Sequence, residues 1–200
     1  APFFCKLIIA AVRMKIKIVG FDKANSKQTI YMYNHNSFFD IFTLPLMKLK
    51  NTRYIFTEKA LGIKGLQWAN YGNDALLLPS SKTENIEQLK RRDQKFKDFT
   101  QLLKDTETSI LTAPEGQHRF DHRIDRFNDG VFKMATESGV QIIPIFIGIP
   151  KENNPFEGYK FKAGTITIEA LDPIDTSNWK LEDLEQNKEA VRKIFVEYFN

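Results

Sequence analysis

The sequence alternates between strand patterns and helix patterns along most of its 200 residues. Strand-like segments alternate apolar and polar residues or are short apolar runs, whereas helix-like segments repeat apolar residues every three or four positions. Such alternation favours an α/β fold, with a mostly parallel central sheet flanked by helices. The expected strands are 14–19, 29–33, 52–56, 75–78, 109–112, 141–147 and 165–170, and the expected helices are 2–13, 83–103, 131–138 and 181–199.

The composition is that of a globular protein. Apolar residues make up 42% of the sequence and both charge signs are frequent, which excludes a disordered or fibrous chain. No repeat, low-complexity tract or Pro/Gly/Ser-rich linker divides the sequence, so we expect a single domain over residues 1–200. The one cysteine, Cys5, has no partner for an internal disulfide and favours a reducing compartment.

The loop after the expected strand 29–33 carries a candidate general base. Asp40 lies five residues after His35, close enough to turn back to the imidazole. A carboxylate bonded to one ring nitrogen fixes the tautomer and raises the basicity of the other nitrogen. No protein nucleophile accompanies the pair, because Cys5 is far away and Ser37 lies between its two members. We therefore expect His35 to activate a hydroxyl of the substrate. The spacing of Ser37 and Asp40 is equally typical of a capped helix start, which leaves a structural role for Asp40 open.

A second loop, residues 113–119, follows the expected strand 109–112. It supplies the carboxylate of Glu115, the small residue Gly116 and the guanidinium of Arg119. Gly116 would let a ligand approach the backbone amides, and Arg119 offers a planar set of donors suited to phosphate. The same residues also fit an ordinary turn followed by a solvated charge.

Taken together, the two loops resemble the lysophospholipid and glycerol-phosphate acyltransferases, whose motif blocks include N-H-x-S-x-x-D and P-E-G-T-R. The resemblance extends from the strand 14–19 through Ile149. Phe127 and Gly130 match a short Phe-x-x-Gly element that follows the second block, and residues 142–145 resemble a fourth block with a central proline.

This resemblance implies a role for each matched position. His35 and Asp40 match the catalytic pair, and we expect the substrate to contact Asn34, Ser37, Glu115, Gly116 and Arg119. It implies transfer of a fatty acyl group to the hydroxyl of a lysophospholipid such as 1-acylglycerol-3-phosphate. The donor would be acyl-CoA or acyl carrier protein as co-substrate, without a cofactor or metal.

Two departures from the family pattern concern the acceptor. Gln117 and His118 stand where the family has Thr-Arg, and Arg119 comes one place later. The second family block ends in an arginine, whereas here the apolar segment runs into Pro79 and two serines. The family associates both arginines with the acceptor's phosphate, so a different headgroup or a non-phosphate hydroxy-lipid is an alternative acceptor.

Two other functions compete with acyl transfer. His118 and His122 have i, i+4 spacing and could bind a metal in a hydrolase, although the glutamate of H-E-x-x-H is absent. The chain could also be a non-catalytic basic lipid-binding module. Nucleic-acid binding is not expected, because Arg91, Arg92 and the lysines within 90–97 alternate with acidic residues, as on a solvated helix face.

The N-terminal segment 1–13 is the candidate for contact with a membrane surface. It combines Phe3, Phe4, Leu7 and Ile8 with Lys6, a pattern that suits an interfacial helix, although the same face could pack on the sheet. No window reaches the roughly 18 consecutive apolar residues of a spanning helix. Because the resemblance implies lipid substrates, we expect a membrane-associated protein on the cytoplasmic face.

Overall fold

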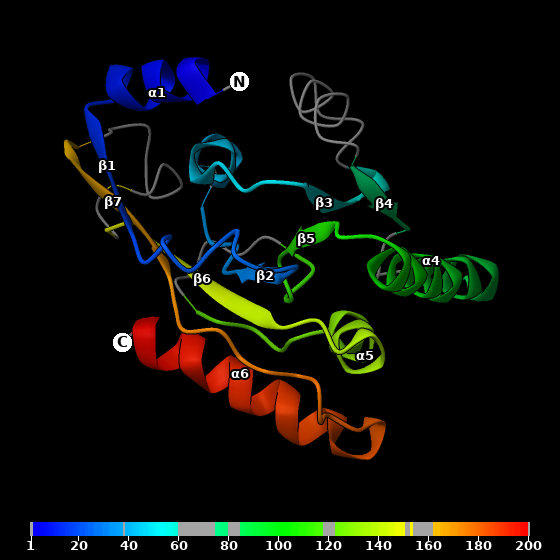
Figure 1. The fold of residues 1–200 in the computed structure, drawn as a ribbon. Coiled ribbons are helices and arrows are strands. Elements are labelled where there is room, and N and C mark those ends of the chain that lie inside the picture. The colour runs from blue at the N-terminus through cyan, green and yellow to red at the C-terminus, as the bar shows by residue number, and fades with distance from the viewer. Residues whose placement is uncertain are drawn as a thin grey trace.

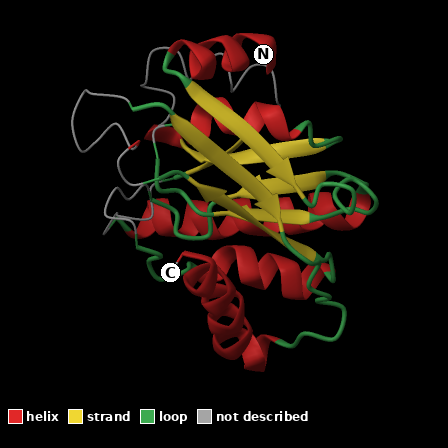
Figure 2. Ribbon diagram, turned by 90° about the vertical axis from the view of Figure 1, so that its left-hand side faces the viewer, coloured by secondary structure: helices red, strands yellow, loops and turns green. Residues whose placement is uncertain are grey.

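The computed structural model describes residues 2–37, 39–59, 75–79, 85–117, 123–150, 153 and 162–199. Its centre is a seven-stranded sheet in the order β1-β7-β6-β2-β5-β3-β4, with helices on both faces (Figures 1 and 2). The strands are β1 Met14–Val19, β2 Ile30–Tyr33, β3 Thr52–Thr57, β4 Leu76–Leu78, β5 Ser109–Thr112, β6 Ile142–Gly148 and β7 Gly164–Ala170. The helices are α1 Pro2–Ala11, α2 Asp40–Thr43, the 3₁₀ helix η1 Leu44–Met47, α4 Ile86–Asp105, α5 Asp129–Ser138, the 3₁₀ helix η5 Leu181–Asp183 and α6 Leu184–Phe199.

The sheet is mostly parallel, as the sequence predicts. Five of its six strand pairings are parallel, and only β6 and β7 pair in opposite directions. Strands β2, β3, β4, β5 and β6 therefore end at the same edge, and both loops identified in the sequence begin there. Pro144 lies within β6 without interrupting it, because the antiparallel pairing with β7 begins one residue later, at Ile145.

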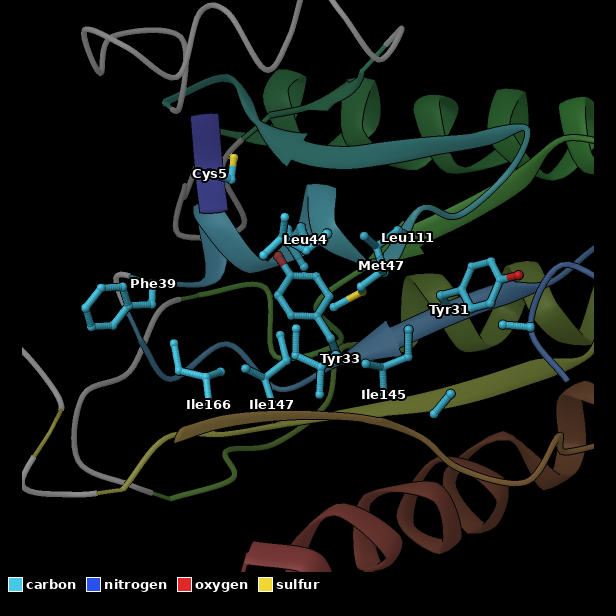
Figure 3. Close-up of a cluster of buried hydrophobic side chains, with 14 of the residues drawn as sticks. Cys5, Tyr31, Tyr33, Phe39, Leu44, Met47, Leu111, Ile145, Ile147 and Ile166 are labelled. Atoms are coloured by element: carbon cyan, nitrogen blue, oxygen red, sulfur yellow. The ribbon is translucent and has the colours of Figure 1, made fainter. Parts of the chain in front are cut away.

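Alternate side chains of the central strands point to opposite faces and form two hydrophobic clusters. Tyr31 and Tyr33 of β2 pack with α1, α2 and η1, as Figure 3 shows for Tyr33 and Leu44. Ile30 and Met32 of the same strand point to the other face, where they pack with α4, α5 and α6. Because both faces are covered, β2 is fully buried, which is typical of a central strand in a parallel sheet.

Local signals account for the helix boundaries. The expected helix 83–103 begins at Ile86, because the side chain of Asn85 accepts hydrogen bonds from the N–H groups of Glu87 and Gln88. Helix α5 ends at Gly139, whose φ of 67° favours glycine. The last expected helix, 181–199, opens with the 3₁₀ turn η5 before α6 begins at Leu184. Within the described residues, no helix combines the length and apolar character needed to cross a bilayer.

Candidate active site

The structure brings His35 and Asp40 together at the carboxyl edge of the sheet. The imidazole Nδ1 lies 2.7 Å from the Asp40 Oδ2. His35 follows β2, and Asp40 is the first residue of α2, so the turn between strand and helix sets this distance. Since a carboxylate only accepts, Nδ1 carries a proton, and in the neutral imidazole Nε2 then has the lone pair. The Asp40 side chain is 2% exposed and that of His35 is 26% exposed, so the imidazole is the member of the pair open to a substrate.

Asp40 also closes the turn that carries it. Its Oδ2 accepts a hydrogen bond of 3.2 Å from the Ser37 N–H, which is one half of the capping arrangement that the sequence predicts. The other half differs, because the Ser37 Oγ accepts from the N–H of Phe39 at 3.1 Å. Asp40 thus orients the imidazole and stabilises the start of α2 at once, and the two interpretations of its sequence position are compatible.

Glu115 links the two loops. One of its carboxylate oxygens accepts from the backbone N–H of His35 at 3.3 Å, and the other accepts from the N–H of Asp125 at 2.9 Å. The residue is only 4% exposed. Burial raises the pKa of the Glu115 carboxyl above its ordinary value, and the two backbone N–H donors act in the opposite direction. Glu115 therefore holds the backbone of the candidate base in place.

Replacing Glu115 by glutamine should change how stability depends on pH. The pKa of this carboxyl is higher in the folded chain than its ordinary value of about 4.5 in the unfolded chain. Its contribution to the free energy of unfolding therefore falls as pH rises from about 4.5 through the raised pKa of the folded chain. We therefore expect the free energy of unfolding of the wild type, minus that of Glu115→Gln, to fall as pH rises from about 4.5 to neutrality. Denaturant unfolding at several pH values measures this difference. The exposed Glu107→Gln serves as control, and a difference that grows with pH would contradict the argument.

Asn128 packs against Gly116, and contact of Gly116 with a ligand stays a prediction. The φ of Gly116 is +65°, and a Cβ atom there would lie 2.5 Å from the Asn128 Nδ2. That amide donates to the carbonyl oxygens of Pro114 and Glu115, at 3.1 and 2.9 Å. The space beside Gly116 therefore holds a side chain that fastens the loop. Sequence reasoning missed Asn128, although it lies inside the recognised element that Phe127 begins.

The side chains of Asn34 and Ser37 form hydrogen bonds with backbone groups of the protein. The Asn34 amide nitrogen donates to the Ile147 carbonyl at 2.9 Å, and its amide oxygen accepts from the Ile147 N–H at 2.7 Å. This pair of bonds ties the end of β2 to β6. The Ser37 hydroxyl is occupied by the N–H of Phe39. Contact of either side chain with substrate stays a prediction.

A cavity of about 290 Å³ opens beside the pair. His35, Asp40 and Gly116 line it, whereas Asn34, Ser37 and Glu115 are not on its wall. Most of the wall is apolar, and it extends over both sides of the sheet edge, with Ile41, Leu44, Pro45, Tyr54, Phe56, Leu78, Phe96 and Val131 among its residues.

Tyr33 and Arg92 are among the wall residues that were not predicted as part of a site. The Tyr33 ring lies edge-on to the His35 imidazole, with centroids 5.6 Å apart, and burial raises the pKa of its hydroxyl. Arg92 was interpreted as part of a solvated helix face, and this interpretation is wrong. Its side chain is half-buried on the cavity wall. Arg119, His118 and His122 lie outside the described residues. A phosphate contact of Arg119 therefore stays a prediction, and a metal site at the histidines stays an alternative.

Comparison with known proteins identifies the family. The family model described as Acyltransferase matches residues 15–148. A chloroplastic 1-acyl-sn-glycerol-3-phosphate acyltransferase of Arabidopsis thaliana is 31% identical over 66% of this chain and 35% of its own length. A 1-acyl-sn-glycerol-3-phosphate acyltransferase of Limnanthes douglasii is 22% identical over 95% of this chain and 65% of its own length. The present chain thus spans about a third of the first relative.

A solved structure has the same fold. The crystal structure of the 1-acyl-sn-glycerophosphate (LPA) acyltransferase PlsC from Thermotoga maritima superposes with a TM-score of 0.73, at 22% sequence identity. It covers 98% of this chain and 77% of the other. The family model spans both loops of the candidate site and the strands that carry them. The chain belongs to the acyltransferase family.

Proposed function

We propose that the chain transfers a fatty acyl group from an acyl thioester to the free hydroxyl of a lysophospholipid, with 1-acylglycerol-3-phosphate as the first acceptor to test. The observation that carries this proposal is the 2.7 Å contact of His35 with a buried carboxylate, at the wall of a largely apolar cavity. Family membership and the names of the relatives support the same activity.

In the proposed reaction, the Nε2 of His35 takes the proton of the acceptor hydroxyl while that oxygen attacks the thioester carbonyl. The Asp40 carboxylate stabilises the imidazolium that forms. The carbon–sulfur bond then breaks, the imidazolium returns its proton to the leaving thiolate, and an ester remains on the acceptor. Protons and bonds balance without a covalent enzyme intermediate.

The burial of Ser37 and Cys5 disfavours both side chains as nucleophiles. The Ser37 hydroxyl is buried and accepts from the N–H of Phe39. Cys5 is buried in α1, and burial raises the pKa of its thiol, which disfavours the reactive thiolate. The acceptor hydroxyl is therefore the nucleophile that the site suits best.

We also propose that α1 contacts the membrane from which the lipid acceptor comes. The buried residues of this helix are Cys5 and Ile9, which pack on the sheet, so that face belongs to the core. Phe3, Phe4 and Leu7 are 76%, 64% and 52% exposed. An exposed aromatic and aliphatic face beside Lys6 suits the interface of an anionic bilayer.

Removing this exposed face should weaken membrane binding. We expect the variant Phe3→Ser/Phe4→Ser/Lys6→Glu to bind anionic vesicles at least about tenfold more weakly, because it loses buried apolar area and a basic residue worth about 1 kcal/mol near such a surface. Vesicle co-sedimentation at increasing anionic-lipid content measures the effect. A matched variant, Ile86→Ser/Leu89→Ser/Lys90→Glu, removes exposed apolar and basic residues from α4 instead. Equal binding by a folded α1 variant and the wild type would place the docking surface elsewhere.

The activity itself is tested by offering labelled acyl-CoA with a panel of lysolipids that differ in headgroup. We expect diacyl product with 1-acylglycerol-3-phosphate and a smaller yield, or none, with hydroxy-lipids that lack phosphate. A preference for another headgroup would retain acyl transfer and change the acceptor. Binding of lysolipids without product from any of them would instead favour the non-catalytic lipid-binding module.

A further inference from the structure

Arg92 is held on the wall of the cavity by contacts that fix its guanidinium. The residue lies in the second turn of α4, and its Nη1 donates to the Pro79 carbonyl at 2.7 Å. Its guanidinium carbon lies 5.2 Å from the centroid of the Phe96 ring. Gly130 makes room for that ring, because a Cβ at Gly130 would lie 2.5 Å from two of its carbons. The guanidinium is therefore in place before any ligand binds.

Arg92 has no counter-ion among the described residues. No described carboxylate lies within ion-pair distance of its guanidinium, and the adjacent Asp93 acts on it only at longer range. Burial lowers the pKa of Arg92, but an arginine remains charged at physiological pH. The Pro79 carbonyl occupies only one of its N–H donors. A half-buried guanidinium of this kind has charge and donors left for an anion in the cavity.

Lys59 places a second cation in the same part of the cavity. It follows β3 and lines the wall together with Arg92, which is anchored just after β4. These two strands are parallel neighbours and end at the same edge. Glu58, the residue before Lys59, pairs with Arg91, the residue before Arg92, with 2.5 Å between Oε1 and Nη2. This ion pair fastens α4 to the end of β3, and we call Lys59 and Arg92 the cationic corner.

The charges on the described part of the wall favour an anion at this corner. Apart from His35, the charged side chains there are Asp40, Lys59 and Arg92. Asp40 contacts the imidazole of His35 and accepts from a backbone N–H in the same turn. The two cations therefore have no carboxylate partner on that wall, and most of the remaining wall is apolar. An apolar cavity with one positive corner suits an amphiphilic ligand that carries an anionic group.

We propose that Arg92, assisted by Lys59, binds a phosphate group of a substrate in the cationic corner. This inference rests on the proposed function, in which both substrates carry phosphate: the acceptor in its headgroup, and the acyl donor at the end of its pantetheine arm. A guanidinium suits phosphate because its planar N–H groups donate two parallel hydrogen bonds. Arg92 is the fixed contact, and the exposed Lys59 adds charge. The two sources share this chemistry, and measurements on each substrate separate them.

The test compares two pairs of ligands whose members differ only in phosphate. The acceptor pair is 1-acylglycerol-3-phosphate and 1-acylglycerol, and the donor pair is S-acyl-4′-phosphopantetheine and S-acyl-pantetheine, all with short acyl chains that keep them monomeric. Calorimetry measures the binding of each ligand alone, so the result does not depend on turnover. We expect the wild type to bind the phosphorylated member of at least one pair roughly 10- to 100-fold more tightly, the range for hydrogen bonds to a charged group.

Substitutions then show whether this preference comes from the cationic corner. Arg92→Gln should bring the two members of one pair to within about threefold of each other, and that pair identifies the source of the phosphate. Arg92→Lys should keep part of the preference, because the charge remains and the paired donors are lost. Lys59→Gln, a change at an exposed residue, should lower the preference by about two- to fivefold. Lys97→Gln removes the same charge from an exposed position of α4 away from the wall and should keep the wild-type preference.

Kinetics with the complete substrates checks the same assignment. We expect Arg92→Gln to raise KM for the substrate whose phosphate preference it removes and to leave KM for the other substrate within about twofold. The inference is wrong if the wild type shows no phosphate preference in either pair. It is also wrong if neither Arg92→Gln, Arg92→Lys nor Lys59→Gln lowers that preference in a folded protein. A wild type whose preference depends on Arg92 but which transfers no acyl group would contradict the proposed function and leave Arg92 as a phosphate-binding residue.

Discussion

His35→Ala is expected to lower kcat for acyl transfer by about 10²- to 10⁴-fold, the usual contribution of a general base. The imidazole is the group that Asp40 orients, and no described side chain near it can replace its function. The fold should survive, because the His35 side chain is partly exposed and the Glu115 carboxylate bonds the backbone of this residue, not its ring. Initial rates with labelled acyl-CoA and a lysophospholipid, together with thermal unfolding, measure both effects.

His122→Ala is the matched control for this substitution, since it removes an imidazole from a position to which the proposed reaction gives no role. We expect its transfer rate to stay within about threefold of the wild type. A folded His35→Ala protein that keeps more than half of the activity would exclude His35 as the base. Hydrolysis of acyl-CoA without transfer, lost in His122→Ala and kept in His35→Ala, would support the metal-dependent hydrolase, which zinc analysis of the purified protein would then confirm or exclude.

Asp40→Asn is expected to lower kcat by about 10²- to 10⁴-fold and to destabilise the protein as well. An asparagine amide can donate to Nδ1, which places the proton on Nε2 and leaves no lone pair to accept the proton of the substrate; the corresponding change in a Ser-His-Asp triad costs about 10⁴-fold. Asp40 also accepts from the Ser37 N–H in a buried turn. Loss of such a bond costs about 1–3 kcal/mol. Rate assays and denaturant unfolding separate the two effects.

The exposed Asp22→Asn removes the same charge and should change neither the rate nor the stability appreciably. If Asp40→Asn lowers stability but retains more than about a third of the wild-type kcat, then Asp40 acts only at the start of α2. In that case the tautomer of His35 must be set by another group, and the base–carboxylate pair would not be the centre of the mechanism.

The fold could be predicted from the sequence because the spacing of apolar residues and the residues typical of helix ends indicate the same elements along the chain. The apolar run of β2 and the alternation within β1 identify strands, and Gly139 marks the end of α5. The start of α4 differs from the prediction because of a side-chain bond, since the amide oxygen of Asn85 begins the helix later than its apolar pattern suggests. Periodicity reports which residues are buried, whereas such bonds depend on individual atoms.

The site was predictable only where its parts are close in sequence. His35 and Asp40 lie within one turn, so their spacing indicates the contact that the structure contains. Asn128 fastens the loop of Gly116 from 12 residues away, and a glycine in the sequence does not reveal which side chain fills its space. Arg92 is separated from His35 by 57 positions, and its helix face has the charge pattern of a solvated surface. Only the packing of α4 against the end of β4 turns it toward the cavity.

The fate of a labelled acyl group shows whether His35 activates the acceptor hydroxyl for direct attack on the acyl donor. The protein is first mixed with labelled acyl-CoA alone, then given 1-acylglycerol-3-phosphate, and mass spectra of the intact protein and of the lipids are recorded before and after. We expect unmodified protein at both times and label in diacyl lipid only after the acceptor is added. An acyl adduct on Ser37 or Cys5 that disappears when acceptor is added, or label found only in free fatty acid, would contradict it.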